Sequence, residues 1–235
     1  MMRGEFRKLS AEVFGTFALV FAGTGAIVIN DVSGGAVTHV GIALTFGMIM
    51  MAMISALGRV SGAHLNPAVT IGFFAARRME GRMVVPYVAS QIFGAFLGSM
   101  VLRVMFSNHP TLGATIPVGG ALQAFSLEFL LATILMFVIL SVSVGSKEQG
   151  GLVGIVVGSV VALEALFAGP ITGASMNPAR SVAPAVVTGC FEYLWVYLTA
   201  PVAGALAGVA VCSLVHGPAC CLSPRKSEQI IESAH

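Results

Sequence analysis

Two short stretches of the sequence are near copies of each other and repeat an asparagine–proline pair in matched surroundings. They read SGAHLNPAVT over residues 61–70 and TGASMNPARS over residues 172–181. Asparagine is a leading N-cap residue and proline is favoured at the first position of a helix, so each pair predicts a helix start. The side-chain oxygen of such a cap accepts from the helix amides, which leaves its NH₂ group as a donor directed away from the helix. The repeated residues are Asn66, Pro67, Ala68, Asn177, Pro178 and Ala179.

Two amide donors beside two helix N-termini would bind a polar neutral molecule and repel cations. A helix N-terminus carries about half a positive charge, and two of them meeting at one point would oppose cations and protons. A water there would accept from both asparagines and point its hydrogens in opposite directions, which interrupts the hydrogen-bonded chain that a hopping proton needs. A single Asn-Pro pair could merely break a buried helix, but two copies in matched contexts favour the paired role. No nucleophile–base pair or metal-binding cluster stands out in the sequence, so we expect neither an enzyme nor a cofactor nor a metal site.

The composition indicates which kind of protein must position these residues. Of the 235 residues, 57% are hydrophobic and 9% are charged, whereas a soluble domain carries about a quarter charged residues. The sequence therefore predicts an integral membrane protein, in which each span needs about 20 mostly apolar residues. Two apolar segments, 67–77 and 178–188, are too short to cross, and each begins at the proline of a repeated motif. Six spans are expected, at residues 9–29, 37–57, 84–106, 122–144, 151–169 and 191–215.

The basic residues indicate the orientation of the spans. With six spans both termini lie on one side, whereas the loops on the opposite side, residues 30–36, 107–121 and 188–190, contain no Lys or Arg. An excess of Lys and Arg marks the cytoplasmic face, so we predict a multi-pass protein of the cell membrane with cytoplasmic N- and C-termini. The basic residues on that side are Arg3, Arg7, Lys8, Arg59, Arg77, Arg78, Arg82, Lys147, Arg225 and Lys226.

The order of the segments predicts an inverted repeat within one channel domain that covers residues 1–235. The first repeat covers about 9–106 and the second about 122–215, and a short cytoplasmic tail follows at 217–235. Each repeat holds three spans, and an odd number inserts the two halves in opposite orientations, related by a pseudo-two-fold axis in the membrane plane. The two short segments then enter from opposite sides and start near the midplane. The expected fold class is an all-α membrane protein with six transmembrane helices and two re-entrant half-helices.

The chain leading into each short segment is expected to be non-helical, and such backbone cannot face lipid. This backbone must be buried in protein or line a water-filled cavity. If it lines such a cavity, its carbonyl oxygens form a ladder of hydrogen-bond acceptors along it. Two glutamates, Glu12 and Glu128, lie within apolar spans, where an unpaired carboxylate is expensive; they could be proton-relay groups of a transporter. The ladder residues are Gly62, Ala63, His64, Gly173, Ala174 and Ser175.

The sequence resembles the major intrinsic protein family, which comprises the aquaporins and the glycerol facilitators. The resemblance covers nearly the whole chain, from AEVFGT at residues 11–16 to the last span. Its most specific part is the pair of Asn-Pro-Ala motifs with Arg180 after the second. The resemblance implies an aquaporin-like right-handed helix bundle and a homotetramer with one pore per subunit. It also implies that Glu12 and Glu128 accept hydrogen bonds from the re-entrant loops rather than relay protons.

Family members carry a second constriction on the outer side of the pore, formed by an arginine and three other side chains. By the family's spacing, the resemblance assigns these positions to Phe46, Ala165, Ala174 and Arg180. Strict water channels usually carry histidine at the position of Ala165, and glycerol facilitators usually carry aspartate at that of Ser181. The mixture resembles the plant nodulin-like intrinsic proteins and, most closely in pattern, their bacterial relatives. That branch passes glycerol, urea or metalloid hydroxides such as arsenous or boric acid, as well as water.

Several functions remain open on the sequence alone. The leading hypothesis is a passive channel for water and small uncharged solutes that excludes protons and ions, and its first alternative is a strictly water-selective aquaporin. A coupled secondary transporter also uses inverted repeats and broken helices, and a membrane adhesion or lipid-organising protein would show no flux. The expected partners are water, small neutral solutes, the lipid bilayer and further copies of the chain, and no nucleic acid is expected. The role of Glu164, which precedes a filter position, stays open between support of the outer loop and a place facing the pore.

Overall fold

The computed structural model describes residues 3–143 and 150–217 and contains eight α-helices within those ranges. Six of these helices are long and apolar enough to cross a membrane, which confirms the all-helical membrane fold expected from the sequence. In chain order the helices are α1 (Arg3–Val32), α2 (Thr38–Ser61), α3 (Pro67–Ala75), α4 (Gly81–Met105), α5 (Ala121–Val142), α6 (Gly150–Thr172), α7 (Pro178–Thr188) and α8 (Leu194–His216).

The helix bounds differ from the predicted spans mainly at their ends. Helix α1 extends beyond the predicted span 9–29 on both sides, because polar residues outside the apolar run continue the helix. Helix α8 begins at Leu194 rather than at residue 191, because Tyr193 adopts a left-handed backbone conformation with φ of 56°. The predicted end at residue 144, the tail beyond Gly217 and the basic residues Lys147, Arg225 and Lys226 lie outside the described residues.

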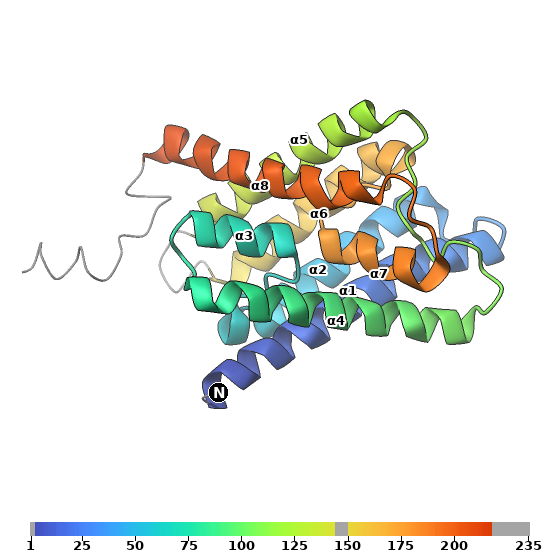
Figure 1. Ribbon diagram of the computed structural model, residues 1–235, viewed down its shortest axis with the longest axis horizontal. Coiled ribbons are helices and arrows are strands. Elements are labelled where there is room, and N and C mark those ends of the chain that lie inside the picture. The colour runs from blue at the N-terminus through green and yellow to red at the C-terminus, as the bar shows by residue number, and fades with distance from the viewer. Residues whose placement is uncertain (1–2, 144–149, 218–235) are drawn as a thin grey trace, which may run out of the picture.

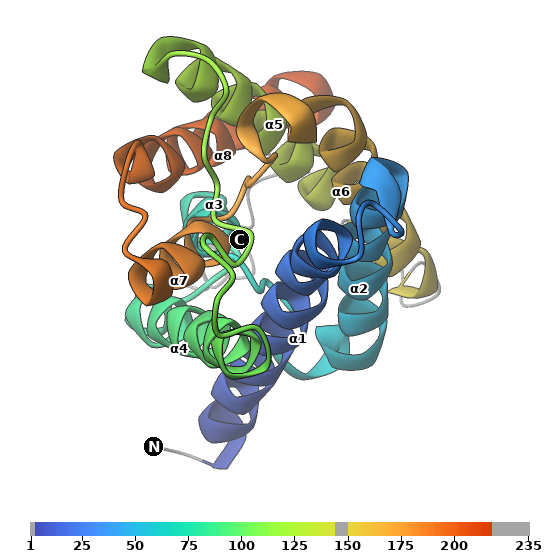
Figure 2. The ribbon, with the colours of Figure 1, turned by 90° about the vertical axis from the view of Figure 1, so that its right-hand side faces the viewer.

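The two short helices lie between α4 and α8, on one side of the bundle that the six long helices form (Figures 1 and 2). The most extensive helix pairs are α1 with α4, α2 with α6 and α5 with α8, and both short helices, α3 and α7, pack against α4 and α8. Figure 1 shows α3 and α7 pointing toward opposite ends of the bundle, with their first turns near its middle. The fold therefore brings the two half-helix starts together from distant parts of the sequence.

Glycines allow helix α4 to approach α1 and helix α8 to approach α5 at matching places in the two halves. A Cβ atom at Gly94 would meet the carbonyl oxygen of Val13, and one at Gly204 would meet the carbonyl oxygen of Phe129. Small residues permit such close backbone contact between membrane helices. The two contacts hold α4 and α8 against the helices that carry Glu12 and Glu128.

Candidate pore and selectivity site

Both repeated asparagines cap a half-helix through their side-chain oxygens. Asn66 Oδ1 accepts from Ala68 N at 2.8 Å, and Asn177 Oδ1 accepts from Ala179 N at 3.0 Å. Each asparagine has an extended backbone, and the helix begins at the proline that follows it. The two side chains lie almost wholly inside the protein, since Asn66 is 1% and Asn177 is 3% exposed.

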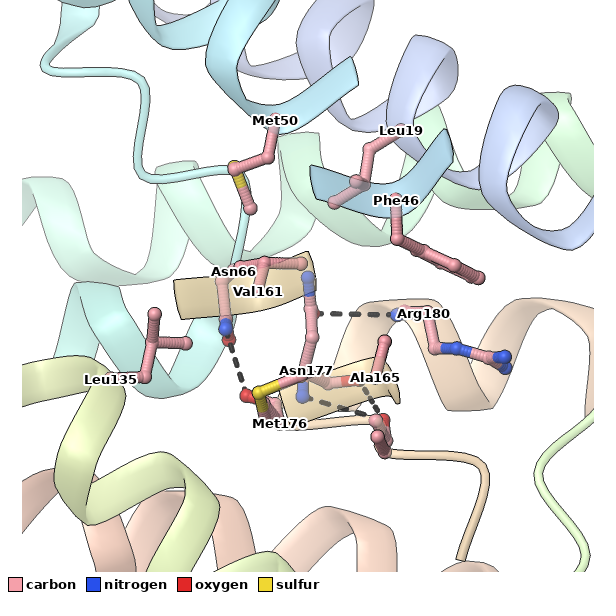
Figure 3. A pocket seen from close by; sticks show the side chains of 12 residues that line it. Leu19, Phe46, Met50, Asn66, Leu135, Val161, Ala165, Met176, Asn177 and Arg180 are labelled. Carbon is pink, nitrogen blue, oxygen red and sulfur yellow. Dashed lines mark hydrogen bonds between the residues drawn. The ribbon is translucent and has the colours of Figure 1, made fainter. Parts of the chain in front are cut away.

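The amide nitrogens of the two asparagines tie the two halves of the chain together. Asn66 Nδ2 donates to the carbonyl oxygen of Met176 at 2.8 Å (Figure 3). Asn177 Nδ2 donates to the carbonyl oxygen of Leu65, also at 2.8 Å. Leu65 and Met176 each adopt a positive φ, of 51° and 54°, at the residue just before each asparagine. The sequence predicts only that each NH₂ group is a donor directed away from its helix. In the structure one hydrogen of each group is used between the halves and the other remains.

Glu12 holds the first re-entrant loop. Its carboxylate accepts from Ser61 Oγ at 2.7 Å and from the backbone N–H groups of His64 and Leu65 at 3.0 and 2.8 Å. The side-chain amide of Gln91 in α4 also donates to it at 2.8 Å. Glu12 is fully buried, so four donors satisfy a carboxylate that would otherwise be costly inside a membrane.

Glu128 holds the second loop in the same way. It accepts from Thr172 Oγ1 at 2.8 Å and from the backbone N–H groups of Ser175 and Met176 at 2.9 and 2.8 Å. Neither Glu128 nor Glu12 is among the residues that line the two central cavities. This geometry fits loop support and offers no support for a proton relay through the pore.

An outer cavity brings together the four positions that the sequence assigned to a filter. Phe46 from α2, Ala165 from α6, Ala174 from the second loop and Arg180 from α7 all line it, beside both asparagines (Figure 3). The other lining residues include the apolar side chains of Leu19 and Val161. The cavity offers about 20 Å³, which exceeds the minimum of about 10–15 Å³ that one water needs.

Arg180 is held at the edge of this cavity and is only 2% exposed. Its Nη1 donates to the carbonyl oxygen of Gly113 at 2.8 Å, and its guanidinium carbon lies 5.3 Å from the centre of the Phe46 ring. A cation so close to an aromatic face is attracted by the ring. The next residue, Ser181, is also buried and bonds Ser175 Oγ at 2.6 Å and Thr115 Oγ1 at 2.9 Å. These contacts fix the start of α7 against both neighbouring loops.

An inner cavity lies on the other side of the paired asparagines and offers about 40 Å³. Gly62, Ala63 and His64 line it, while Ala174 and Ser175 line the outer cavity. Asn66 lines both cavities, so they adjoin at that residue. Of the expected carbonyl ladder, only Gly173 is not among the residues that line either cavity.

The ring of His64 is fixed between neighbours rather than free in the inner cavity. Its Nδ1 lies 3.1 Å from Thr70 Oγ1, its ring stacks on Phe73 at 4.5 Å between centroids, and it approaches the Tyr87 ring at 5.2 Å. The environment favours a structural role for this side chain at the edge of the cavity.

Several supporting groups escaped the sequence analysis. Tyr87 and Tyr197 donate through their hydroxyl groups to the carbonyl oxygens of Ser61 and Thr172, at 2.9 and 2.7 Å, at the entry to each loop. In the sequence, the only indication of this role is that the two tyrosines occupy equivalent places in the segments that form α4 and α8. Gly113 gave no signal at all, because its contribution is a backbone carbonyl.

Glu164 lies beside the filter but does not line the cavity. It is 1% exposed, and neither carboxylate oxygen has a hydrogen-bond partner in the described part of the chain. The side chain therefore neither faces the outer cavity nor supports the outer loop through a hydrogen bond in that part.

A model of the major intrinsic protein family matches residues 2–212. The chain belongs to this family. Aquaporin NIP1-4 of Oryza sativa subsp. japonica is 47% identical to it over 208 residues, which are 88% of this chain and 76% of the relative. Nodulin-26 of Glycine max is 44% identical over 210 residues, or 89% of this chain and 78% of the relative.

A solved structure shows the same fold. The aquaglyceroporin from Plasmodium falciparum superposes with a TM-score of 0.81 at 25% identity, covering 92% of this chain and 98% of that one. The resemblance to nodulin-like proteins, inferred from the filter residues, is confirmed by the sequence similarity to Nodulin-26 and the NIP1 aquaporins. Aquaporins are channels rather than enzymes, so family and fold support a passive channel with six membrane spans.

Proposed function

We propose that the chain forms a pore that passes water and small uncharged solutes and excludes protons and ions. The observation that carries this proposal is the outer cavity, where Phe46, Ala165, Ala174 and Arg180 meet beside the paired asparagines. The inner cavity adjoins it at Asn66. A solute would therefore move between polar sites along the middle of the bundle, with the whole chain acting as one channel domain.

Exclusion of cations follows from the fixed positive charges along this path. Arg180 is buried, so its charge is little screened by solvent and acts strongly across the narrow cavity. The N-termini of α3 and α7 add their partial positive charges at the paired asparagines. An anion would lose its hydration shell against the apolar walls of Leu19 and Val161, and that loss is costly. A neutral solute avoids both penalties.

The range of solutes follows from the size and polarity of the outer cavity. Alanine at both Ala165 and Ala174 leaves space that a larger side chain would fill, and Phe46 offers an apolar wall to the carbon atoms of a solute. Arg180 donates to hydroxyl oxygens. Glycerol, urea and uncharged metalloid hydroxides such as arsenous and boric acid fit this pattern. The structural similarity to the aquaglyceroporin from Plasmodium falciparum supports this range of solutes.

A strictly water-selective channel is the second candidate, and one observation favours it. The outer cavity offers only about 20 Å³, which is close to the minimum for a single water. A coupled transporter is disfavoured because Glu12 and Glu128 already accept hydrogen bonds from the loops and so do not form an ion site.

Stopped-flow light scattering on proteoliposomes tests the proposal. We expect faster osmotic shrinkage than in empty liposomes, followed by re-swelling with glycerol, urea or boric acid as the osmolyte. Shrinkage without re-swelling would support the water-selective alternative. Solute accumulation driven by a proton gradient would support a transporter, and unchanged shrinkage would overturn the channel proposal.

We further propose a homotetramer in the cell membrane with cytoplasmic termini. The family membership and the one-sided distribution of basic residues support this arrangement. The mass of the purified protein in detergent should correspond to four chains. In a chain whose own cysteines, including Cys190 of the outer loop, are replaced by serine, a reagent that cannot cross the membrane should label an added cysteine in the loop at residues 33–37 but not one beside Arg59.

A further inference from the structure

The position of the Arg180 guanidinium depends on the outer loop between α4 and α5. Gly113 in this loop accepts from Arg180 Nη1 at 2.8 Å. Arg180 Nε has no hydrogen-bond partner in the described ranges 3–143 and 150–217. A shift of the Gly113 carbonyl would therefore remove the hydrogen bond that orients the charged end of the side chain.

Gly113 is positioned by a tight turn whose residues are well anchored. Leu112 is fully buried and packs against Val28 and Leu102. Leu112 and Gly113 both have positive φ values, of 49° and 72°. A Cβ atom at Gly113 would come within 2.9 Å of Thr24 Cβ, so the loop passes directly over α1. A turn of this shape needs hydrogen bonds that hold its backbone in place.

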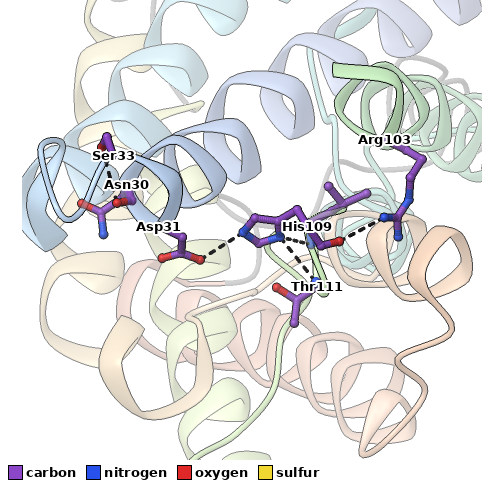
Figure 4. A network of polar contacts seen from close by, with 7 residues as sticks. Asn30, Asp31, Ser33, Arg103, His109 and Thr111 are labelled. Atoms are coloured by element: carbon purple, nitrogen blue, oxygen red, sulfur yellow. Dashed lines mark hydrogen bonds and ion pairs between the residues drawn. The ribbon is translucent and has the colours of Figure 1, made fainter. Parts of the chain in front are cut away.

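The side chain of His109 supplies two of those hydrogen bonds, in addition to the backbone bond from Ala114 N to the Thr111 carbonyl oxygen at 2.9 Å. His109 Nδ1 accepts from the backbone N–H of Leu112 at 3.0 Å and from that of Thr111 at 3.4 Å. Figure 4 shows the ring between this turn and Asp31 at the end of α1, where Nε2 and Asp31 Oδ2 are 3.2 Å apart. Because Nδ1 faces two donors, it must be the unprotonated nitrogen, and the ring hydrogen must be on Nε2, where it donates to Asp31.

We propose that His109 is a positioning residue for Arg180. As a neutral imidazole it holds the turn at residues 111–113, and a second proton, placed on Nδ1, releases that turn and with it the Gly113 carbonyl. The inference rests on the proposed function, since it assigns Arg180 to the filter. It adds control of that filter by the pH of the outer solution.

The charged groups around His109 determine how readily the second proton binds. Asp31 from α1 would stabilise an imidazolium, whereas the Arg103 guanidinium from α4 opposes it. Arg103 Nη1 donates to the carbonyl oxygen of His109 at 3.0 Å and to that of Ser107 at 2.8 Å. From α7, the nearest contribution is the carbonyl oxygen of Val187, which also faces Arg103. Histidine ordinarily changes its charge between about pH 5 and pH 8, so mild acid is the relevant signal.

Protons can reach this site from the outer surface. The His109 side chain is 6% exposed, but the Asp31 side chain is 53% exposed. Both residues, with Ser107 and Asn108, line an open hollow on that face of the protein. The turn at His109 is therefore in contact with the outer solution, and a proton can reach it without passing through the pore.

Release of the turn would reduce the passage of solutes. Without the Gly113 carbonyl, the guanidinium keeps its attraction to the Phe46 ring on the other side of the cavity. The side chain would move toward that ring and narrow an already small space. We expect glycerol permeability to fall by about threefold or more between about pH 7.5 and about pH 5.5, the interval in which histidine gains its proton.

Three substitutions test separately the hydrogen-bond acceptor of His109, its ability to gain a proton, and the negative charge of Asp31. His109→Asn keeps an acceptor for the backbone N–H groups, because asparagine side chains accept from residues further along the turn, but it does not titrate. His109→Phe keeps a ring and removes the acceptor. Asp31→Asn keeps an acceptor for Nε2 and removes the negative charge, so protonation of His109 should require a lower pH.

The experiment measures glycerol and water permeability of the full chain in proteoliposomes between about pH 7.5 and about pH 5.5. We expect a fall in acid for the unchanged protein, a flat profile near the neutral value for His109→Asn, and low values throughout for His109→Phe. The midpoint should move to lower pH in Asp31→Asn. A flat profile in the unchanged protein, or an unaltered acid response in His109→Asn, would overturn the inference. Absence of flux at neutral pH would instead overturn the proposed function.

Discussion

The outer and inner ends of the pore are built from related positions in the two halves of the chain, but their side chains differ. A residue at a given number of positions from Asn66 along the chain corresponds to the residue at the same number of positions from Asn177. The outer cavity is lined by an arginine, a phenylalanine and two alanines, whereas the related inner positions are all aliphatic. The four outer positions are Phe46, Ala165, Ala174 and Arg180, and all of them line the outer cavity. Their inner counterparts, in the same order, are Val157, Ile54, Ala63 and Val69, and all of them line the inner cavity.

The scaffold beneath these side chains is repeated much more faithfully than the cavity walls. Both asparagines cap a half-helix, both glutamates hold a loop, and both tyrosines bond the carbonyl at the entry of that loop. The repeat therefore supplies a frame for two half-helices. We propose that selectivity depends on the few positions at which the outer end departs from the inner one.

The loop-supporting glutamates should differ in importance, although their geometry is similar. Glu128→Gln places an NH₂ group against donors and leaves Ser175 N or Met176 N unpaired, which costs about 1–3 kcal/mol. It also removes a negative charge that attracts Arg180. Glu12→Gln should cost less, because Gln91 can rotate its amide and accept from the new NH₂ group.

Thermal unfolding in detergent and glycerol flux in liposomes measure this difference. We expect the largest loss of both in Glu128→Gln, with flux reduced by about tenfold, the equivalent of 1.4 kcal/mol. Equal losses in Glu12→Gln would show that the two halves support the pore to the same extent.

Replacing Arg180 by valine gives the outer end the residue that Val69 supplies at the inner end. The change removes the fixed charge from the constriction, so protons or small cations should leak faster, by roughly tenfold. A pH-sensitive dye inside liposomes under a potassium diffusion potential measures the leak. Val69→Ala is the matched control and should leave the leak unchanged. If Arg180→Val leaks no more than this control, the arginine does not act as an electrostatic barrier.

The scaffold could be predicted from the sequence, whereas the contacts between distant backbone groups could not. The spans, the half-helix starts and the caps follow from local rules, because apolar length and Asn-Pro pairs act within a few residues. The loop support by Glu12 follows from the cost of a buried carboxylate, together with a family resemblance. The hydrogen bond from Asn66 to the Met176 carbonyl joins residues far apart in the chain. A carbonyl acceptor of this kind has no characteristic residue type.

The outer loop shows the same limit more strongly. From the sequence, residues 107–121 were notable only for lacking Lys and Arg. The structure brings the Gly113 carbonyl to Arg180, and His109 Nδ1 accepts from the backbone N–H of Leu112 in the same turn. Loop paths of this kind depend on tertiary packing, here the burial of Leu112 against α1 and α4, and not on local propensity.

Ala165→His tests the size of the outer end. The larger, polar side chain fills part of the cavity, so glycerol or boric acid flux should fall several-fold more than water flux, since a cavity near the minimum for one water loses larger solutes first. Parallel stopped-flow traces with and without a permeant osmolyte give both rates. Ala165→Ile, which introduces the residue found at Ile54, controls for bulk without a polar group. An equal loss of water and glycerol would remove Ala165 from the filter.

The tyrosines allow a balanced comparison of the two loops. Tyr87→Phe and Tyr197→Phe each remove one hydrogen bond, to Ser61 and Thr172 respectively, and should each lower the free energy of unfolding by about 0.5–1.5 kcal/mol. Only Tyr197→Phe should also change the ratio of glycerol to water flux, because Thr172 leads directly into Ala174. A change of this ratio in Tyr87→Phe as well would mean that the inner loop contributes to selectivity.

Glu164 marks a further difference between the halves, since Met53 occupies the related position in the first. Its two oxygens lack hydrogen-bond partners in the described residues, and a buried unpaired carboxylate costs several kcal/mol, so we expect the neutral acid. Glu164→Gln then exchanges one neutral side chain for another and should alter the free energy of unfolding by no more than about 0.5 kcal/mol. Glu164→Met, the residue of the first half, should stabilise the protein, because it removes a buried polar group without a partner. Thermal unfolding of both variants gives the comparison, and a loss of stability in both would mean that the carboxyl group stabilises the fold.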